Sequence, residues 1–376
     1  MNKKIVFICV TSQNVITFRL SLIKTLQKKG YEVHVICFDD KYKKEIEENS
    51  IIFHNVDGSN RGLNVFDNLR LKSKYYKIIK EINPCLVFTF MLKPNVFGVC
   101  AAKKAGVKNI YSMVEGVGDV YINNNFKWKI IRFIVNFLYK RSFKFSKNVY
   151  FLNEDDKVLF RKYKLVSEGQ CILIDGIGVD SNKFAYCPIE ENEKIIFLMV
   201  ARLNRTKGVY EYCDASRKLK QKYSNVECWL VGQEGNVKLS DIKTYIDEGS
   251  VVYKGTTDNI YEFYKQCHIC VLPSYREGMP MSLLEAMSTG RAIITTNTKG
   301  GCRHIVQDGV NGLLVKEKDS EDLFAKMSIM INNRKMIVSC GENSRKMIDT
   351  KYNMKKINLE IMKNLESSNK GVFINE

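Results

Sequence analysis

The chain of 376 residues is 45% hydrophobic and 27% charged, which is typical of a globular protein large enough for two domains. With 5 Pro and no Ser- or Gly-rich tract, the composition excludes a long disordered linker. No run approaches the roughly 20 apolar residues that span a bilayer, and the apolar run at residues 5–10 is too short for a signal peptide. We therefore expect a protein that stays on the cytoplasmic side.

The net charge of +18 is distributed unevenly. Residues 1–190 contain 31 Lys and Arg against 18 Asp and Glu, whereas the remainder contains 28 against 23. Such a field favours nucleic acid, an anionic lipid surface or a phosphorylated substrate as the partner. The alternative is the lysine bias of an AT-rich genome, which would have no functional meaning.

Strands and helices alternate along the first half of the chain. Glycines at positions 30 and 106 follow two of the helical patterns, as is typical of helix ends. We predict helices over 18–29 and 95–104 and strands over 4–10, 32–38, 86–89 and 109–114.

The alternation begins again at residue 194, after a segment of mixed polarity at 176–189. This pattern predicts an α/β fold with two Rossmann-like domains, with ligands in a cleft faced by the carboxyl ends of strands. The expected domains are 1–185 and 186–350, and 351–376 is expected to be a helix that returns to the first domain. The predicted helices 209–222 and 283–288 alternate with strands over 195–200, 227–231, 251–253, 269–272, 292–295 and 312–315.

The 12 cysteines are scattered, and many lie in strand-like runs, which indicates reduced core residues. Cys267 and Cys270 form the one C-x-x-C pair, which could belong to a metal or redox site. No second pair completes such a site, and the surrounding run is apolar, so we expect a buried strand here.

Two short segments of the second half carry candidate chemistry. Arg202 and Lys207 follow a strand and precede a helix, where basic groups can hold a diphosphate. A solvated loop with no ligand would show the same sequence pattern. Glu277 and Glu285 bracket a turn and the start of a helix. Glu285 lies among apolar residues and therefore needs a partner, which could be a ribose diol.

These segments resemble the donor domain of the retaining glycosyltransferases of family 4. Glu277 to Glu285 is similar to the E-x7-E motif of that family, and ARLNRTKG resembles its phosphate clamp. Three further segments are similar to sequences typical of the family: VLPSYREGMPMSLLEAMSTGRAIITT, GGCRHIVQDGVNGLLV and IGVDSNKF. The sequence departs from the family at His304, where a glutamate is usual, and we interpret His304 as structural.

The resemblance implies the two-domain GT-B fold and a UDP-sugar as donor substrate. It implies that Arg202 and Lys207 hold the donor diphosphate in place of a metal, so no cofactor is expected. It further implies that Glu277 contacts the donor sugar and Glu285 the ribose hydroxyls. The backbone between them completes the expected donor site, at Gly278, Met279, Pro280 and Met281.

Three loops of the first domain follow strands and should bind the acceptor. Glu115 occupies a place where many relatives have a histidine, so it is a candidate catalytic residue, although a structural turn is the alternative. The other candidate acceptor residues are Ser12, Gln13, Asn14, Arg19, Lys93, Asn95 and Gly116.

TFR, KPN and VEGVGDVY are similar to the subgroup that extends sugars on undecaprenyl diphosphate for capsule, O-antigen or protein N-glycosylation. The resemblance implies a lipid-diphosphate-linked saccharide as acceptor and favours N-acetylgalactosamine in an α-1,3 link. Another donor or acceptor sugar within the same class is the alternative.

Residues 126–148 carry seven basic side chains and no acid. On a helix, Ile130, Phe133, Ile134, Phe137 and Leu138 share one face, and Trp128 and Tyr139 would suit a membrane interface. Such a helix can lie on an anionic bilayer. Alternatively, the apolar face packs on its own sheet and only the lysines meet lipid.

Two other classes of protein fit less well. A nucleic-acid-binding protein would explain the charge but leaves the E-x7-E pattern without a role, so no nucleic-acid partner is expected. A GT-B sugar-nucleotide epimerase would use a soluble substrate and leaves the basic first domain unexplained.

Overall fold

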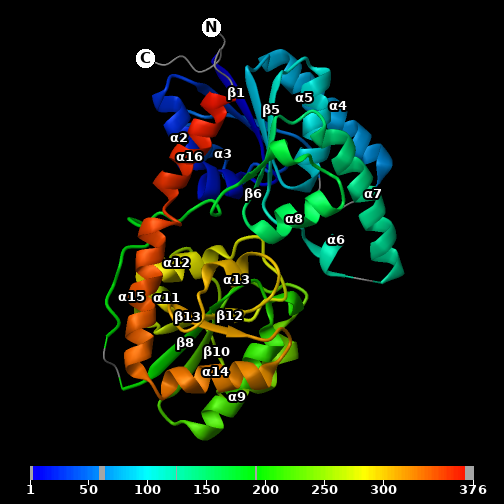
Figure 1. The fold of residues 1–376 in the computed structure, drawn as a ribbon. Coiled ribbons are helices and arrows are strands. Elements are labelled where there is room, and N and C mark those ends of the chain that lie inside the picture. Colours follow the sequence, from blue (N-terminus) through cyan, green and yellow to red (C-terminus); the bar gives the residue numbers. More distant parts are fainter. Residues whose placement is uncertain (1–2, 59–63, 124, 191–192, 369–376) are drawn as a thin grey trace. The chain divides into compact units, whose positions relative to one another are not determined.

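The computed structural model describes residues 3–58, 64–123, 125–190 and 193–368 (Figure 1). The chain forms two compact units. Unit 1 consists of Met1–Ile177 with Lys355–Glu376, and unit 2 is Gly178–Met354. The expected fold class of two α/β domains with parallel sheets is confirmed.

Unit 1 is built on a parallel sheet with the strand order β3-β2-β1-β4-β5-β6-β7. Every residue of β4 and β5 is buried, as is typical of parallel strands covered by helices on both faces. The strands are β1 (Lys4–Ile8), β2 (Glu32–Cys37), β3 (Ile52–Asn55), β4 (Leu86–Phe90), β5 (Asn109–Val114), β6 (Asn148–Phe151) and β7 (Cys171–Leu173).

Two π-helical turns lie in unit 1 where a chain leaves a strand and enters a helix. They are η1 (Val15–Arg19), after β1, and η2 (Pro94–Gly98), after the neighbouring strand β4. The helix predicted over 18–29 therefore begins earlier, at Ser12, and includes η1. The helices are α1 (Ser12–Asn14), α2 (Leu20–Lys28), α3 (Lys43–Glu48), α4 (Val65–Ile82), α5 (Val99–Lys104), α6 (Asp119–Ile122), α7 (Phe126–Phe143), α8 (Glu154–Lys162) and the 3-10 turn η3 (Glu168–Gln170).

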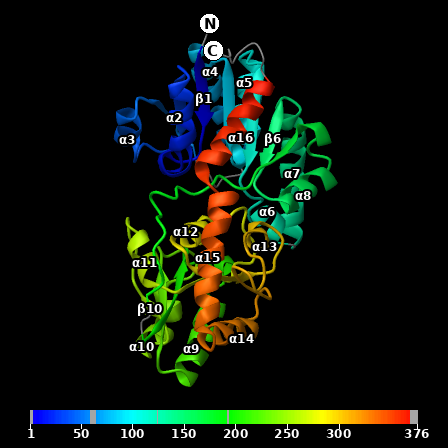
Figure 2. The same ribbon diagram turned by 60° about the vertical axis from the view of Figure 1, so that its left-hand side comes forward.

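The last helix, α16 (Met354–Ser367), completes unit 1 after the chain has passed through unit 2 (Figure 2). Asn358 Nδ2 donates to Ser21 Oγ on α2 at 2.8 Å, and Glu366 pairs with Lys29 just beyond α2. Its buried side chains include Ile361 and Leu365.

Unit 2 has a second parallel sheet, with the order β10-β9-β8-β11-β12-β13. One apolar core joins this sheet to its helices. The strands are β8 (Ile195–Val200), β9 (Val226–Val231), β10 (Val252–Tyr253), β11 (Ile269–Leu272), β12 (Ala292–Thr296) and β13 (Gly312–Val315). The helices are α9 (Val209–Lys222), α10 (Lys243–Asp247), α11 (Tyr261–Gln266), α12 (Met281–Thr289), α13 (Gly301–Ile305), α14 (Ser320–Ile331) and α15 (Arg334–Thr350), with 3-10 turns η4 (Arg205–Lys207) and η5 (Leu239–Ile242).

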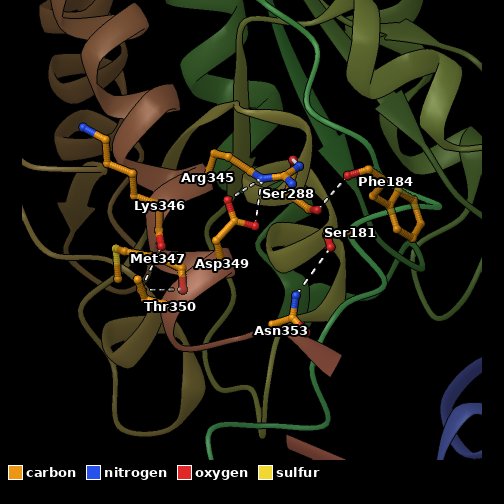
Figure 3. A network of polar contacts seen from close by, with 9 residues as sticks. All are labelled: Ser181, Phe184, Ser288, Arg345, Lys346, Met347, Asp349, Thr350 and Asn353. Carbon is orange, nitrogen blue, oxygen red and sulfur yellow. Dashed lines mark hydrogen bonds and ion pairs between the residues drawn. The ribbon is translucent and has the colours of Figure 1, made fainter. Parts of the chain in front are cut away.

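The segment that enters unit 2 is bound to α12 and to the residues that follow α15 (Figure 3). Arg345 Nη1 donates to Ser288 O at 2.9 Å, and Ser288 Oγ donates to Phe184 O at 2.7 Å. Val179 N donates to Tyr352 O at 2.9 Å. These bonds place residues 178–184 in unit 2, so the boundaries lie at 177/178 and 354/355 rather than at 185/186 and 350/351.

Cys270 is buried in β11 and Cys267 is buried two residues before that strand, with their sulfur atoms 3.6 Å apart. This position agrees with the expected buried strand. Within the described ranges, no group of three or more His, Cys, Asp and Glu side chains is arranged to hold a metal ion.

Candidate active site

In unit 2, two loops leave the carboxyl ends of the neighbouring strands β8 and β11 and bind each other. Thr206 O accepts hydrogen bonds from Tyr275 N at 2.9 Å and from Ser274 Oγ at 3.0 Å. Because the parallel strands end at the same edge of the sheet, these bonds bring the two segments singled out in the sequence together.

Lys207 and Glu277 form an ion pair across these loops. Lys207 Nζ lies 2.5 Å from Glu277 Oε1, and Ser274 Oγ donates to the same oxygen at 2.6 Å. The Glu277 side chain is 12% exposed and that of Lys207 29%. The cation and the carboxylate are therefore held in place, yet each remains accessible to a ligand.

Arg202 is exposed, and in the part of the chain that the structure describes its side chain makes no hydrogen bond or ion pair. The structure therefore does not join it to Lys207 by a contact. Its place directly after β8 puts its backbone on the same loop.

A pair of glycines after β12 supports the loop that carries Glu277. Gly301 N donates to Glu277 O at 2.8 Å, and a Cβ at Gly301 would overlap Gly278 O. Gly300 has a φ of 110°, and a Cβ there would overlap Glu277 O. These glycines were not among the residues expected at the donor site, although two consecutive glycines are a signal of close backbone approach.

Glu285 lies on α12, which begins at Met281 directly after Pro280. Gly278 and Met279 form the turn before it, so the four backbone positions expected at the donor site are contiguous with the first turn of the helix. The free N–H groups of that turn can meet an anion.

The Glu285 side chain is partly accessible, but its carboxyl group is enclosed by protein. Burial raises the pKa of this carboxyl to about 7, while the hydrogen bond from Tyr264 and the charge of Lys183 act in the opposite direction. The Tyr264 hydroxyl lies 3.1 Å from Oε2 and 2.9 Å from Ser282 O. Tyr264 is the partner that the buried carboxylate was expected to need, and the sequence did not identify it.

In unit 1, Arg19 and Glu115 form an ion pair at the carboxyl ends of the central strands. Arg19, at the end of η1, is 2% exposed, and its guanidinium lies 4.1 Å from the centroid of the Phe90 ring at the end of β4. Burial lowers the pKa of Arg19 to about 10, so the side chain stays charged at neutral pH. Glu115 and Gly116 follow β5, and Gly116 has a φ of 155°.

The loop after β4 contains one internally bonded side chain and one basic side chain near the surface. Asn95 is fully buried, accepting from Thr89 Oγ1 at 2.7 Å and donating to Met113 O at 2.9 Å. Lys93 is 7% exposed, and burial lowers its pKa. Among the residues described, its side chain forms no hydrogen bond or ion pair and is only attracted by the charge of Asp67, so its ammonium group can take an anionic ligand.

The loop after β1 is largely occupied by bonds within the fold. Ser12 is buried, binds Asp39 and accepts a hydrogen bond from Tyr42 N at 3.1 Å. Asn14 Nδ2 lies 3.6 Å from Met91 Sδ, and Gln13 is exposed. Of the expected acceptor residues, Ser12 and Asn95 therefore maintain the loops.

Two family models match the chain. The model described as glycosyl transferases group 1 matches residues 188–347, and the model described as glycosyl transferase 4-like matches residues 4–153. Each match falls within one of the two halves of the chain.

Similar curated proteins cover almost the whole sequence. N,N'-diacetylbacillosaminyl-diphospho-undecaprenol alpha-1,3-N-acetylgalactosaminyltransferase of Campylobacter jejuni is 31% identical over 91% of this chain and 93% of its own length. UDP-Gal:alpha-D-GlcNAc-diphosphoundecaprenol alpha-1,3-galactosyltransferase of Escherichia coli is 24% identical over 90% of each chain.

Solved structures share the fold at low identity. A glycosyltransferase from Rickettsia africae superimposes with a TM-score of 0.79 at 18% identity, covering 98% of this chain and 99% of that one. Anabaena HepE in complex with UDP gives 0.78 at 19% identity, covering 97% and 100%. From these matches and from the E-x7-E segment with its paired lysine, we conclude that this chain is a glycosyltransferase of family 4 with the GT-B fold.

Proposed function

We propose that this enzyme transfers N-acetylgalactosamine, in an α-1,3 linkage, from UDP-N-acetylgalactosamine to a saccharide carried on undecaprenyl diphosphate. The C. jejuni and E. coli relatives, whose names specify diphospho-undecaprenol acceptors and α-1,3 links, support the acceptor class and the linkage. The higher identity to the N-acetylgalactosaminyltransferase favours that sugar over galactose.

The observation that carries the proposal is the cluster of Lys207, Glu277 and Ser274 beside α12. A donor diphosphate would give Lys207 a second anionic partner, with Arg202 on the same loop and the helix N-terminus supplying further positive charge. Glu277 would then be available to the hydroxyls of the sugar, and Glu285 would accept hydrogen bonds from the ribose. The uridine diphosphate leaves with its charge compensated by these groups.

On the acceptor side, Lys93 is the basic group best suited to a phosphate oxygen, because its ammonium forms no hydrogen bond or ion pair among the described residues. Arg19 holds Glu115 at the end of β5, and the carboxylate of Glu115 can accept a hydrogen bond from an acceptor hydroxyl. The reaction would take place at the cytoplasmic face of the plasma membrane, where such lipid-linked saccharides are extended.

The decisive experiment incubates the purified enzyme with UDP-sugars and lipid-diphosphate-linked acceptors and determines the product linkage by NMR. Transfer from UDP-N-acetylgalactosamine with an α-1,3 product is expected. Faster transfer from another UDP-sugar would reassign the donor, and epimerisation of UDP-N-acetylglucosamine without an acceptor would replace the proposal with an isomerase.

We further propose that the reaction requires no metal ion. Turnover should therefore persist in excess EDTA, because Arg202 and Lys207 provide the positive charge at the diphosphate. Turnover that is lost in EDTA and restored by Mg²⁺ or Mn²⁺ would contradict this assignment.

A further inference from the structure

Helix α7 of unit 1 presents a stripe of large apolar side chains to solvent. At about 100° per residue, the members fall within roughly 100° of one another on the helix. Isolated exposed apolar residues are common, but a continuous row on one helix is not. The row, which we call the α7 stripe, consists of Phe126 (79% exposed), Ile130 (47%), Phe133 (76%), Ile134 (48%) and Phe137 (59%).

The opposite face of α7 covers unit 1. Its buried side chains are Val135, Tyr139, Ser142 and Phe143, and Leu138 packs against the same core. Of the apolar face considered in the sequence, only Leu138 turns inward, together with Tyr139. The alternative in which that face packs on the sheet is therefore wrong for the four members from Ile130 to Phe137.

Basic side chains surround the α7 stripe. Lys127 and Lys129 lie on either side of its first turn, and Lys140 flanks its last turn. Arg141 and Lys144 continue the same face beyond Phe137. All of these side chains are exposed, and the sequence from 126 to 148 contains no acid.

The helix α6, which follows the acceptor loop of Glu115, is bound directly to α7. Arg132, on the inner side of α7, donates from Nε to Val120 O at 2.9 Å and from Nη2 to Asn123 O at 2.6 Å. Tyr121, which like Val120 lies on α6, binds Asn136 of α7. The short helix that follows the Glu115 loop is thus fixed to the helix that carries the stripe.

We propose that the α7 stripe enters the interfacial region of an anionic lipid bilayer, with the basic side chains that surround it against the lipid phosphates. An apolar row bordered by lysines and arginines matches the boundary between acyl chains and negatively charged headgroups. A protein partner of ordinary composition would not require the surface around the stripe to lack acidic side chains. Because the exposed row extends along α7 from Phe126 to Phe137, the helix would lie parallel to the surface. Within the described residues no helix is long and apolar enough to cross a membrane.

The inference deepens the proposed function, because it rests on an acceptor that is embedded in the same bilayer. Through Arg132, the helix that touches lipid is also fixed to α6, the short helix that follows the loop of Glu115. The enzyme would then bind a lipid-linked saccharide at the membrane surface without extracting the lipid from the bilayer.

The test compares the Phe133→Ser/Phe137→Ser variant with Phe66→Ser/Leu69→Ser, a matched control on α4 of the same unit, whose side chains are 81% and 57% exposed. Sedimentation is measured with vesicles of phosphatidylglycerol and phosphatidylcholine, and with phosphatidylcholine alone. The α7 variant should lose on the order of 10-fold or more in partitioning onto anionic vesicles, while the control should bind like wild type. Wild type should bind neutral vesicles much more weakly.

A series of charge-removing variants tests the basic side chains around the stripe separately. Lys140→Gln/Arg141→Gln/Lys144→Gln should weaken binding by roughly 5-fold per charge in low salt, whereas Lys44→Gln/Lys77→Gln/Lys80→Gln, at exposed sites elsewhere on unit 1, should have little effect. Equal vesicle binding by the α7 variants and their controls would overturn the proposal. So would light scattering that shows a wild-type dimer converted to a monomer by Phe133→Ser/Phe137→Ser.

Turnover separates this inference from the function on which it rests. With a short-chain, water-soluble acceptor, the α7 variants should keep the wild-type rate, and with a long-chain acceptor in vesicles they should be slowed at least 10-fold. Vesicle binding by wild type without transfer to any lipid-linked acceptor would contradict the proposed function and leave the membrane surface intact.

Discussion

At the scale of single residues, the ion pair between Lys207 and Glu277 gives the E-x7-E pattern a specific arrangement. The sequence suggested a basic clamp and a carboxylate with separate ligands. In the structure the two side chains bind each other, with Ser274 as a third member. Loss of one charge therefore changes the environment of the other as well as the contact to the donor.

Lys207→Ala should slow transfer by about 10- to 100-fold, because a charge-assisted contact contributes roughly 1.5–3 kcal/mol. Arg202→Ala should have an effect of similar size if the exposed guanidinium reaches the diphosphate. Steady-state rates with saturating acceptor measure both. Lys238→Ala, an exposed lysine of the same unit paired with Glu234, serves as the control. Normal rates in both variants would place the phosphate site elsewhere.

Donor binding should depend on pH through Glu285. The pKa of this carboxyl is about 7 in the absence of donor, and ribose hydroxyls bind best to the ionised form. A UDP-sugar has no phosphate group that titrates near neutral pH, unlike free UDP. Binding of the UDP-sugar should therefore release a proton, and its affinity should fall as the pH drops below about 7, approaching 10-fold per unit. Calorimetry at several pH values measures this slope.

Glu285→Gln is the control for that titration. It should bind the UDP-sugar more weakly at pH 8, since the ionic acceptor is lost, and its affinity should vary little between pH 5.5 and 8. A wild-type slope retained in Glu285→Gln would assign the titration to another group.

At the scale of elements, the loop of Glu277 is shaped by the glycines that follow β12. Gly301→Ala should weaken UDP binding by on the order of 10-fold or more, because the new methyl group overlaps Gly278 O and must displace backbone. Gly169→Ala, which has no atom within 4 Å of its added Cβ, should leave binding unchanged. Isothermal titration with UDP distinguishes the two, and equal affinities would mean that the loop adjusts freely.

The six strands of unit 2 and the strands β1, β2, β4 and β5 could be predicted because buried parallel strands are short apolar runs closed by helix patterns, whereas β3, β6 and β7 were not predicted. Arg19, Glu115 and Lys93 could be identified as candidates because each follows such a run. Their individual roles could not be predicted. Ser12 and Asn95 occupy equivalent positions in the sequence, after strands, but their side chains are bound within the fold. The π-helical turns η1 and η2 also have no local pattern that separates them from ordinary helix.

The exposure of the α7 stripe was equally beyond the sequence. A helix with apolar residues on two faces does not reveal which face meets the core. The face of Val135, Tyr139 and Phe143 is the buried one because these residues pack against side chains of neighbouring elements, such as Phe160 on α8. Which face of α7 is buried therefore depends on contacts with residues distant in the sequence.

At the scale of the whole molecule, the two units should respond differently to changes in α16. Ile361→Ala and Leu365→Ala remove buried side chains from unit 1 and should each lower the free energy of unfolding by about 2–5 kcal/mol. UDP affinity, which depends on unit 2, should be unchanged under conditions where the protein is folded. Chemical denaturation and UDP titration measure the two effects, and a parallel loss of UDP binding would show that the units are not independent.

The discontinuity of unit 1 has a consequence for biosynthesis. Residues up to Ile177 leave the ribosome first, but the helix that covers α2 is translated only after all of unit 2. Until then, the apolar groups that α16 shields stay open to water, to chaperones and to other nascent chains. Unit 2 is continuous and can fold as soon as Met354 has emerged. The half of the enzyme that is made first is therefore the half that is finished last.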